Sequence, residues 1–371
     1  PSIDHWMIGR GLIADPFLPK KIEEGRYNDI RECIGCNMCV SRWEKGGPPI
    51  WCTQNPTSGE EYRRGWHPEN YVPTKNPDHP IVVVGAGPAG LECAMTLGLR
   101  GYNTVHLIEA EAEIGGHLRW VSKLPNFGAW KRVVDWRETQ IKTKTNVQII
   151  LNNRLNYQDA LECGAESIIF ATGSSWNETG MSAPLHDYIA GADASKPEIC
   201  TPEQYCVHGK KLGKRVLVID NDPYYMGSAM AELIAEKGHE VTYVTWGETV
   251  GVYLRLVLEE QRMLMRLMEL GVTTINQHVA VAVEDGLIVP VVKYANSKDL
   301  PQINTEIKDF AGRAKDKKLT PAEIEGSTFT ISNLGMFGIE SFTSIINQPN
   351  SAILSIGAIV QKPIIKNNEI M

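Results

Sequence analysis

Four cysteines in one short stretch are the residues of this sequence best suited to carry chemistry. They are Cys33, Cys36, Cys39 and Cys52, and the first three follow one another at intervals of three residues. This spacing lets one tight loop present three thiolates to an iron–sulfur cluster, while the fourth comes from farther along the chain. Zinc sites more often combine a CxxC pair with a second CxxC or an HxxxH pair. We therefore favour a cluster, with zinc and cysteines that hold no metal as the alternatives.

A glycine-rich turn follows an apolar segment at residues 81–84. Gly85, Gly87 and Gly90 lie between that expected strand and a helix, and Glu109 ends the next expected strand. The first glycine permits the turn, the second lets backbone approach a pyrophosphate, and the helix N-terminus supplies N–H groups. A carboxylate in the position of Glu109 accepts a hydrogen bond from a ribose hydroxyl. These residues predict a dinucleotide-binding unit, and the same fold with an empty site is the alternative.

A second unit of similar layout lacks the first two glycines. We expect a strand over Arg215–Ile219, a helix over Ser228–Lys237, a strand over Glu240–Val244 and a further helix over Leu256–Leu270. The turn between the first strand and the helix carries Asp220 and Asp222 at the two glycine positions. Carboxylates there would block close approach and repel a pyrophosphate. We therefore predict that this unit binds no nicotinamide dinucleotide.

Length and composition indicate a folded chain of several domains. The 371 residues are 43% hydrophobic and carry a net charge of −7, which gives no support to general binding of nucleic acid or acidic membranes. No apolar run approaches the roughly 20 residues that cross a bilayer, and the N-terminus lacks the layout of a signal peptide. The clustered cysteines favour a reducing, cytoplasmic setting over a secreted disulfide framework. The start without methionine and the abrupt end suggest a fragment.

The pattern changes after about His278. A pair of strands is expected over Ala280–Val283 and Leu287–Val292, around an acidic turn. An amphipathic helix should follow, because apolar residues recur three and four positions apart. These residues are Leu300, Ile303, Ile307, Phe310 and Ala314. A capping box from Thr320 to Glu323 predicts a short helix before a strand at Thr328–Ile331.

Residues 1 to about 277 resemble the C-terminal part of trimethylamine and dimethylamine dehydrogenases, iron–sulfur flavoproteins related to 2,4-dienoyl-CoA reductase. The matching motifs are Ile8–Pro16, Arg31–Cys39, Gly85–Gly90, Gly115–His117 and Ala171–Gly173. The resemblance implies that the four cysteines hold a 4Fe-4S cluster and that the glycine-rich unit holds ADP or FAD. It also implies that Arg10 contacts the phosphate of FMN at the end of a barrel, a position that suits a loop after a barrel strand.

The same resemblance implies an electron route. Electrons would pass from a reduced flavin through the cluster to an electron-transferring flavoprotein, with ADP bound structurally. Trp130 and Trp136 could line the exit surface, and core packing is the alternative. We place Gly116 and His117 at the nucleotide, while a helix-capping or catalytic role for His117 stays open. Most of the family's catalytic barrel, with its FMN pocket, has no counterpart in this sequence.

Residues from about 280 to 371 resemble part of the catalytic domain of the dihydrolipoyl acyltransferase component of 2-oxoacid dehydrogenase complexes. The matching motifs are Asp285–Val292 and Gly326–Gly338. The resemblance implies that Ser332 helps to stabilise a tetrahedral oxyanion, whereas a strand residue without an active role is the alternative. The family's catalytic histidine has no match, because no histidine follows His278. Active sites of the family lie between subunits of a trimer, so a homo-oligomer is open here.

We therefore expect an α/β chain that joins two incomplete enzymes. Its segments would be a remnant of the last TIM-barrel βα unit at 1–30, a cluster-binding region at 31–78, a dinucleotide-binding unit at 79–200, a degenerate Rossmann-like unit at 201–278 and a partial acyltransferase-like segment at 279–371. The remnant would consist of an apolar strand around residues 6–8 and a helix through residues 17–22. The favoured function is an iron–sulfur flavoprotein oxidoreductase fragment. The alternatives are an acyltransferase fragment or assembly module and a chimeric chain without integrated function. The last segment should be loosely ordered or packed on an oligomer partner.

Overall fold

The computed structural model divides the chain into two compact units, Pro1–Val283 and Glu284–Met371, which are described separately below. Described are residues 8–44, 50–222, 224–283, 291–315, 318–324, 326–334, 339, 350–359, 365–366 and 369–370. For residues 42–44, 315, 321, 365–366 and 369–370 the structure describes the backbone alone. Within these ranges, no helix is long and apolar enough to cross a membrane.

The N-terminal part of the first unit consists of short helices joined by irregular chain. The elements are α1 (Arg10–Ala14), α2 (Leu18–Glu23), η1 (Tyr27–Asp29), α3 (Met38–Glu44) and α4 (Glu61–Arg64). The helix expected around residues 17–22 is confirmed as α2. Of the strand expected near residues 6–8, Trp6 and Met7 lie outside the described residues and Ile8 is not in a strand. Buried ion pairs hold this part together, because Lys21 Nζ lies 2.7 Å from Asp15 Oδ2 and 2.9 Å from Glu69 Oε1.

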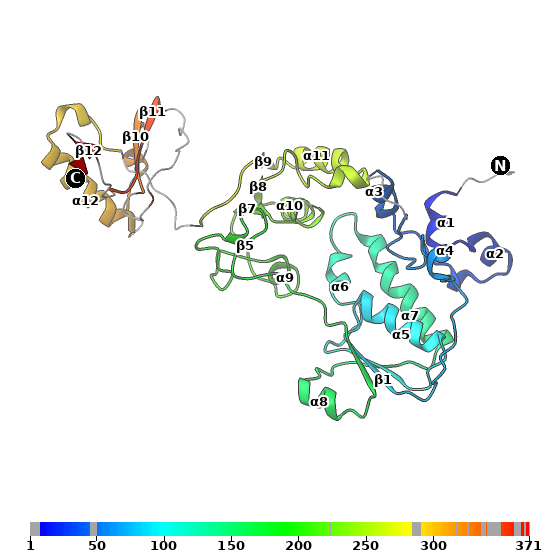
Figure 1. Cartoon of the computed structure of the whole chain (residues 1–371). Coiled ribbons are helices and arrows are strands. Elements are labelled where there is room, and N and C mark those ends of the chain that lie inside the picture. Colours follow the sequence, from blue (N-terminus) through cyan, green and yellow to red (C-terminus); the bar gives the residue numbers. More distant parts are fainter. Residues whose placement is uncertain are drawn as a thin grey trace. The chain divides into compact units, whose positions relative to one another are not determined.

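The first Rossmann-like unit contains a parallel sheet in the order β3-β2-β1-β4. Its elements are β1 (Ile81–Val84), α5 (Pro88–Leu99), β2 (Val105–Ile108), α6 (Leu118–Val121), η2 (Gly128–Lys131), α7 (Arg132–Lys144), β3 (Gln148–Ile150), α8 (Tyr157–Glu162) and β4 (Ser167–Phe170). Strand β1 is buried along its whole length between β2 and β4. Helices α5 and α7 lie side by side (Figure 1), and one apolar core joins them to β1 and β2. Both expected strands of this unit are confirmed.

The second Rossmann-like unit contains a smaller parallel sheet in the order β7-β8-β9. Two short strands and a helix precede it, β5 (Met181–Ser182), β6 (Asp187–Tyr188) and α9 (Pro202–Cys206). The unit itself consists of β7 (Arg215–Asp220), α10 (Met226–Glu236), β8 (Glu240–Thr245), η3 (Leu254–Val257), α11 (Glu260–Glu269) and β9 (Thr273–Ile275). The expected strands and the first helix are confirmed.

Two expectations near the end of the first unit differ from the structure. A single helix over Leu256–Leu270 is wrong, because Leu258 adopts a left-handed conformation with φ of 61° and separates η3 from α11. A regular strand over Ala280–Val283 is also wrong, since this segment forms one isolated bridge, between Ala282 and Ala190. Residues 284–290, where its expected partner begins, lie outside the described residues, and Val291 and Val292 are not in a strand.

The second unit is built around one helix and a parallel strand pair. Its elements are η4 (Ala295–Ser297), α12 (Leu300–Lys315), η5 (Pro321–Glu323), β10 (Phe329–Asn333), β11 (Ala352–Ile356), β12 (Ile365–Lys366) and β13 (Glu369–Ile370). The expected amphipathic helix is confirmed as α12, and Glu323 accepts the expected hydrogen bond from the backbone of Thr320 at 2.8 Å. The segment that follows Thr320 is a single 3-10 turn rather than the expected α-helix.

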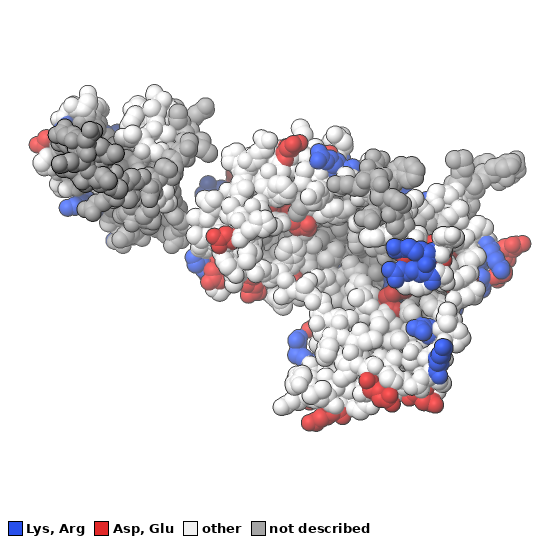
Figure 2. Space-filling model, in the orientation of Figure 1, with Lys and Arg blue, Asp and Glu red and all other residues white. Residues whose placement is uncertain are grey.

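Apolar side chains in the second unit are exposed where a core would bury them. Leu300 of α12 is 81% exposed, and Ile331 of β10 and its neighbour Leu354 of β11 are 61% and 49% exposed. Phe310 of α12 is buried. The face that carries Ile331 and Leu354 is thus open within the described part of this unit. On the first unit, Figure 2 shows acidic and basic side chains interspersed on a largely uncharged face.

Candidate cofactor sites

All four cysteines of the cluster motif line one small cavity. Cys33 and Cys36 come from the loop before α3, Cys39 from its first turn, and Cys52 from the segment that returns beside it. Two left-handed residues, Gly35 and Asn37, make the loop turn back on itself, with φ of 71° and 54°. The four cysteines are half-buried and form no disulfide. The structure therefore brings the four thiols together, although twelve residues separate Cys39 from Cys52 in the sequence.

Hydrogen bonds reach the thiols of this cavity. Cys36 Sγ lies 3.2 Å from Thr53 Oγ1, and the backbone N–H of Gly35 donates to Cys33 Sγ at 3.4 Å. Burial raises the pKa of the Cys39 and Cys52 thiols, while backbone N–H groups near each sulfur act in the opposite direction. N–H groups that point at sulfur are the contacts that tune iron–sulfur clusters.

Zinc sites and 4Fe-4S clusters can both be bound by four cysteines, and they differ in how far apart the sulfurs stand. Within the described ranges, no three His, Cys, Asp or Glu side chains converge on one point where a single metal ion could sit. A tetrahedral zinc site would need sulfurs about 2.3 Å from the ion and hence roughly 3.8 Å from one another. In a 4Fe-4S cluster each thiolate binds a different iron, so the sulfurs stand farther apart around a shared cavity. Four cysteines that line one cavity are the donor set that a 4Fe-4S cluster uses.

A buried arginine fixes the segment that carries Cys52. Arg137 of α7 is 3% exposed and donates to both Gln54 Oε1, at 2.9 Å, and the backbone oxygen of Gln54, at 3.0 Å. Its Nε lies 2.7 Å from Glu92 Oε2 on α5. Burial lowers the pKa of Arg137, and the Glu92 carboxylate opposes that shift. The first Rossmann-like unit thereby positions the cysteine segment, a role that no local motif around Arg137 signals.

A second buried arginine joins the loop to the N-terminal helices. Arg31 donates through its backbone N–H to Asp15 Oδ2 at 2.8 Å and through its guanidinium to Asn55 Oδ1 at 3.0 Å. The guanidinium also stacks 4.2 Å from the ring centre of Trp136, whose indole N–H donates to the backbone oxygen of Asp29. Trp136 therefore serves packing, the alternative reading of this residue.

Trp130 is likewise a packing residue. Its ring stacks with Phe127 at 5.9 Å and meets Tyr225 edge-on at 6.5 Å. These rings belong to the apolar core of the second Rossmann-like unit.

Two of the three motif glycines are required by the protein's own packing. A Cβ on Gly90 would lie 1.8 Å from the Gly85 backbone oxygen, and one on Gly85 would lie 2.4 Å from the Ala171 oxygen. A Cβ on Gly87 would meet nothing within 4 Å, and its φ of −72° suits any residue. The protein's own packing therefore does not require glycine at position 87, and a glycine there leaves room for a pyrophosphate to approach the start of α5.

Glu109 stands at the end of β2 beside this turn. It is buried, and its two carboxylate oxygens accept hydrogen bonds from the backbone N–H of Ala86, at 2.8 Å, and of Glu111, at 3.0 Å. Each oxygen keeps a second lone pair, so a ribose hydroxyl can still donate to it. Glu109 thus also fixes the glycine-rich turn, a contact that the sequence motif does not reveal.

The Gly116–His117 loop lies against the glycine-rich turn. A Cβ on Gly116 would be 3.2 Å from Gly87 Cα, and the N–H of Gly115 donates to the Ala86 oxygen at 2.8 Å. His117 precedes α6, but its side chain makes no capping hydrogen bond. His117 Nε2 instead lies 2.5 Å from Glu203 Oε1 of α9. This pair links the nucleotide region to the second Rossmann-like unit.

The turn of the second unit is filled by its own aspartates. Asp220 is 2% exposed, and a Cβ on Gly227 at the start of α10 would lie 2.5 Å from its Oδ1. Its Oδ2 accepts from the Tyr243 hydroxyl at 2.5 Å and from Thr245 Oγ1 at 3.0 Å. Burial raises the pKa of Asp220 to about 6. Asp222 caps α10 by accepting from the backbone of Tyr224 and Met226. A dinucleotide would have to displace these contacts.

Two further predicted residues are Arg10, which joins the cysteine cavity, and Ser332, which lies in the second unit. Arg10 of α1 lines the cysteine cavity and hydrogen-bonds the Asn37 side chain. Ser332 lies in β10 opposite Ser355 of β11, on the half-buried side of the strand pair.

Comparison with known proteins separates the chain at the same region. Residues 83–143 match the NAD(P)-binding Rossmann-like domain, residues 200–299 the OYE-like second alpha/beta domain, and residues 270–371 the catalytic domain of the 2-oxoacid dehydrogenases acyltransferase. Dimethylamine dehydrogenase of Hyphomicrobium sp. (strain x) is 46% identical over 291 residues, which cover 77% of this chain and 39% of that protein. The Rickettsia felis dihydrolipoyllysine-residue acetyltransferase component of the pyruvate dehydrogenase complex is 50% identical over 92 residues, covering 25% of this chain and 22% of that protein. The chain is therefore similar to dimethylamine dehydrogenase along most of its length and to an acyltransferase component at its C-terminal end.

Solved structures agree for the larger part. Histamine dehydrogenase from Rhizobium sp. 4-9 matches with a TM-score of 0.73 and 37% identity, over 85% of this chain and 48% of that one. The 6-hydroxypseudooxynicotine amine oxidase from Pseudomonas geniculata N1 matches with a TM-score of 0.71 and 39% identity, over 75% of this chain and 41% of that one. The larger part thus shares the mixed α/β fold of these structures and is similar to them in sequence, and the chain spans less than half the length of these relatives.

Proposed function

We propose that the first unit is the electron-relay portion of an iron–sulfur flavoprotein oxidoreductase of the amine dehydrogenase type. The single observation that carries this proposal is the cavity shared by Cys33, Cys36, Cys39 and Cys52. Held there by four thiolates, a 4Fe-4S cluster would accept and release single electrons. The homology to dimethylamine dehydrogenase supports the proposal.

The chain's own residues would hold this group rigidly. Arg137 and Arg31 fix the segment around Cys52 and the loop before α3 from opposite sides. The guanidinium of Arg10 borders the cavity, where its positive charge would offset the negative charge of four thiolates. In the parent family Arg10 would contact the phosphate of FMN, and in this structure it donates a hydrogen bond to the side chain of Asn37.

We propose that the first Rossmann-like unit binds ADP structurally, with FAD as the alternative. The unoccupied space at Gly87, the N-terminus of α5 and the spare acceptors of Glu109 support a pyrophosphate and a ribose there. Gly116 borders the same turn, and His117 lies next to it. The receiver of the electrons would be an electron-transferring flavoprotein, and the free thiols suit the cytoplasm.

Reduction in the absence of air tests this function. We expect the anaerobically purified chain to show a broad visible absorbance that bleaches with dithionite and returns when oxidised electron-transferring flavoprotein is added. Heat-released nucleotide should be ADP at about one per chain. A chain with no visible absorbance and no nucleotide would contradict the proposal.

A second function is supported by the acyltransferase homology and by the open apolar face of β10 and β11. The second unit would then be an acyltransferase fragment or assembly module that covers this face by homo-oligomerisation. It has no histidine to act as a base, so Ser332 alone would not complete the thiol chemistry. A trimeric mass in sedimentation would favour this function. A monomer that retains no CoA would favour a chimeric chain without integrated function.

A further inference from the structure

Strand β7 is paired on one side only. It lies at the edge of the sheet β7-β8-β9, whereas β1, which begins the first Rossmann-like unit in the same way, is flanked by β2 and β4. The consequence is visible in burial, because all four residues of β1 are buried while Leu217 of β7 is 55% exposed. Among the described residues, no strand pairs with β7 in the place that β4 takes beside β1.

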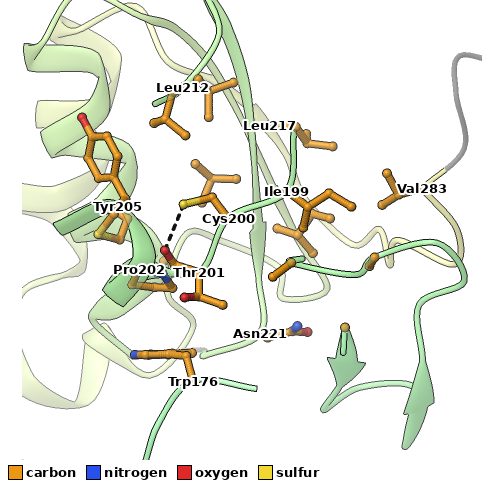
Figure 3. Close-up of a pocket in the computed structure, with 18 of the residues that line it drawn as sticks. Trp176, Ile199, Cys200, Thr201, Pro202, Tyr205, Leu212, Leu217, Asn221 and Val283 are labelled. Carbon is orange, nitrogen blue, oxygen red and sulfur yellow. Dashed lines mark hydrogen bonds between the residues drawn. The ribbon is translucent and has the colours of Figure 1, made fainter. Parts of the chain in front are cut away.

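A cavity of about 460 Å³ lies along this open edge. Five consecutive residues of β7, Arg215–Ile219, line it, together with residues from the segment 176–202 and Val283. Figure 3 shows Leu217, Ile199 and Val283 around the same opening, with Trp176 and Asn221 at its lower border. Its lining is mainly apolar, so the cavity suits side chains of the kind that a buried strand carries.

The charged side chains that line the cavity are mostly acidic. Three carboxylates line it, those of Glu178, Glu198 and Asp222, against the one guanidinium of Arg215. The Glu178 carboxylate accepts from Gln204 and that of Asp222 from backbone N–H groups, so neither is neutralised by a cation within the described contacts. Lysine or arginine side chains at the ends of a bound segment would complement this border.

We propose that the β7 edge is a docking site for an extended segment of a partner protein, apolar in its middle and flanked by basic residues, which adds a strand parallel to β7. Unpaired backbone groups of the edge would supply hydrogen bonds and the cavity would receive alternate side chains. Five residues at about 3.3 Å each make a segment of roughly 16 Å, the length of strand that lines the cavity. The parallel direction follows from β4, which runs parallel to β1 in the equivalent position. This site is independent of the cluster and of the nucleotide.

A labelled peptide tests the proposal on the full chain. The probe carries the sequence of Ser167–Phe170 between two lysines with a fluorescein at its N-terminus. A control peptide has proline in place of the residue equivalent to Ile169, because proline removes a backbone donor. Leu217→Lys removes an apolar contact and repels the lysines, whereas Met268→Lys makes the same charge change on α11, outside the cavity, at a side chain that is 77% exposed.

We expect one peptide to bind per chain, about tenfold more weakly to Leu217→Lys and equally well to Met268→Lys. Hydrogen exchange of the β7 amides should slow when the probe is bound. Absence of binding, equal binding of the proline peptide, or equal loss in both variants would overturn the proposal. So would self-association of the free chain that Leu217→Lys abolishes, because a second copy would then be the occupant. An apolar dye that fills the cavity without being displaced by the probe would assign it to a small molecule instead.

Discussion

Two glycines of one motif should respond in opposite ways to the same added methyl group. Gly90→Ala places a Cβ 1.8 Å from the Gly85 backbone oxygen, and neither partner can move without shifting α5 or the turn. Gly87→Ala places a Cβ in open space at a φ of −72°. The first substitution therefore tests the packing of the fold, and the second tests the presence of a ligand.

The structure sets the size of each effect. Overpacking costs about 1–3 kcal/mol, and a contact this close should reach the upper end, about 3 kcal/mol. For a folded unit of this size each kcal/mol lowers Tm by about 2–4 °C, so Gly90→Ala should melt roughly 6–12 °C below the wild type. Gly87→Ala should change the free energy of unfolding by less than about 1 kcal/mol, and a rise is expected if it has any effect.

For nucleotide affinity we expect the substitution at position 87 to have a large effect, although it barely changes stability. A methyl group at position 87 would push a pyrophosphate away from backbone N–H groups, and a hydrogen bond to a charged group contributes about 1.5–3 kcal/mol. ADP should therefore bind about 10- to 100-fold more weakly to Gly87→Ala.

The assay is thermal unfolding of nucleotide-free protein, followed by calorimetric titration with ADP. An unchanged ADP affinity in Gly87→Ala would refute the claim that a pyrophosphate lies in the open space beside Gly87. A Tm for Gly87→Ala as low as that of Gly90→Ala would refute the packing argument.

Three further outcomes are expected. Asp220→Asn should be more stable than the wild type at pH 8, by on the order of 2 kcal/mol, and nearly as stable as the wild type at pH 4. Because the pKa of Asp220 is raised to about 6, the wild type loses stability as the pH rises from about 4 to 6, whereas the variant does not. Thermal unfolding of both proteins across this pH range checks the expectation, and parallel stability curves would disprove it. Arg137→Lys keeps the positive charge but loses the paired contacts to Gln54. We expect its free energy of unfolding, measured with a denaturant, to fall by about 2 kcal/mol and its iron content to fall as well. An iron content equal to that of the wild type would contradict the positioning role. Ile331→Lys should dissociate any oligomer formed through the β10 and β11 face without lowering Tm, which sedimentation checks, and an oligomer that survives it uses another surface.

Local patterns predicted most of the regular structure in the first unit. Four apolar residues before Gly85 become β1, and the similar run at Arg215 becomes β7, because such runs need cover on both faces. The break at Leu258 was not predictable, since its apolar spacing continues a helical pattern while the backbone turns left-handed. The failed strand at Ala280–Val283 has a similar cause. Its composition suits a strand, but the residues next to it supply only the single bridge to Ala190.

The candidate sites divide in the same way. Spacing groups the first three cysteines, because they lie within seven residues, whereas Cys52 needs the fold to bring it to the same cavity. The contacts that fix them, from Arg137 to Gln54 and from Arg31 to Asn55, join segments distant in sequence and carry no motif. The contact between His117 and Glu203 could not be predicted from the sequence either, since it depends on how α9 packs against the first Rossmann-like unit.

The measurement that tests the central claim most directly is iron and acid-labile sulfide per chain in anaerobically purified protein and in two serine variants. Cys52→Ser removes a thiol of the shared cavity, while Cys93→Ser removes a half-buried thiol of α5 that does not line it. The account predicts about four irons and four sulfides in the wild type and in Cys93→Ser, and a marked loss in Cys52→Ser. Iron without sulfide, or equal content in both variants, would contradict it.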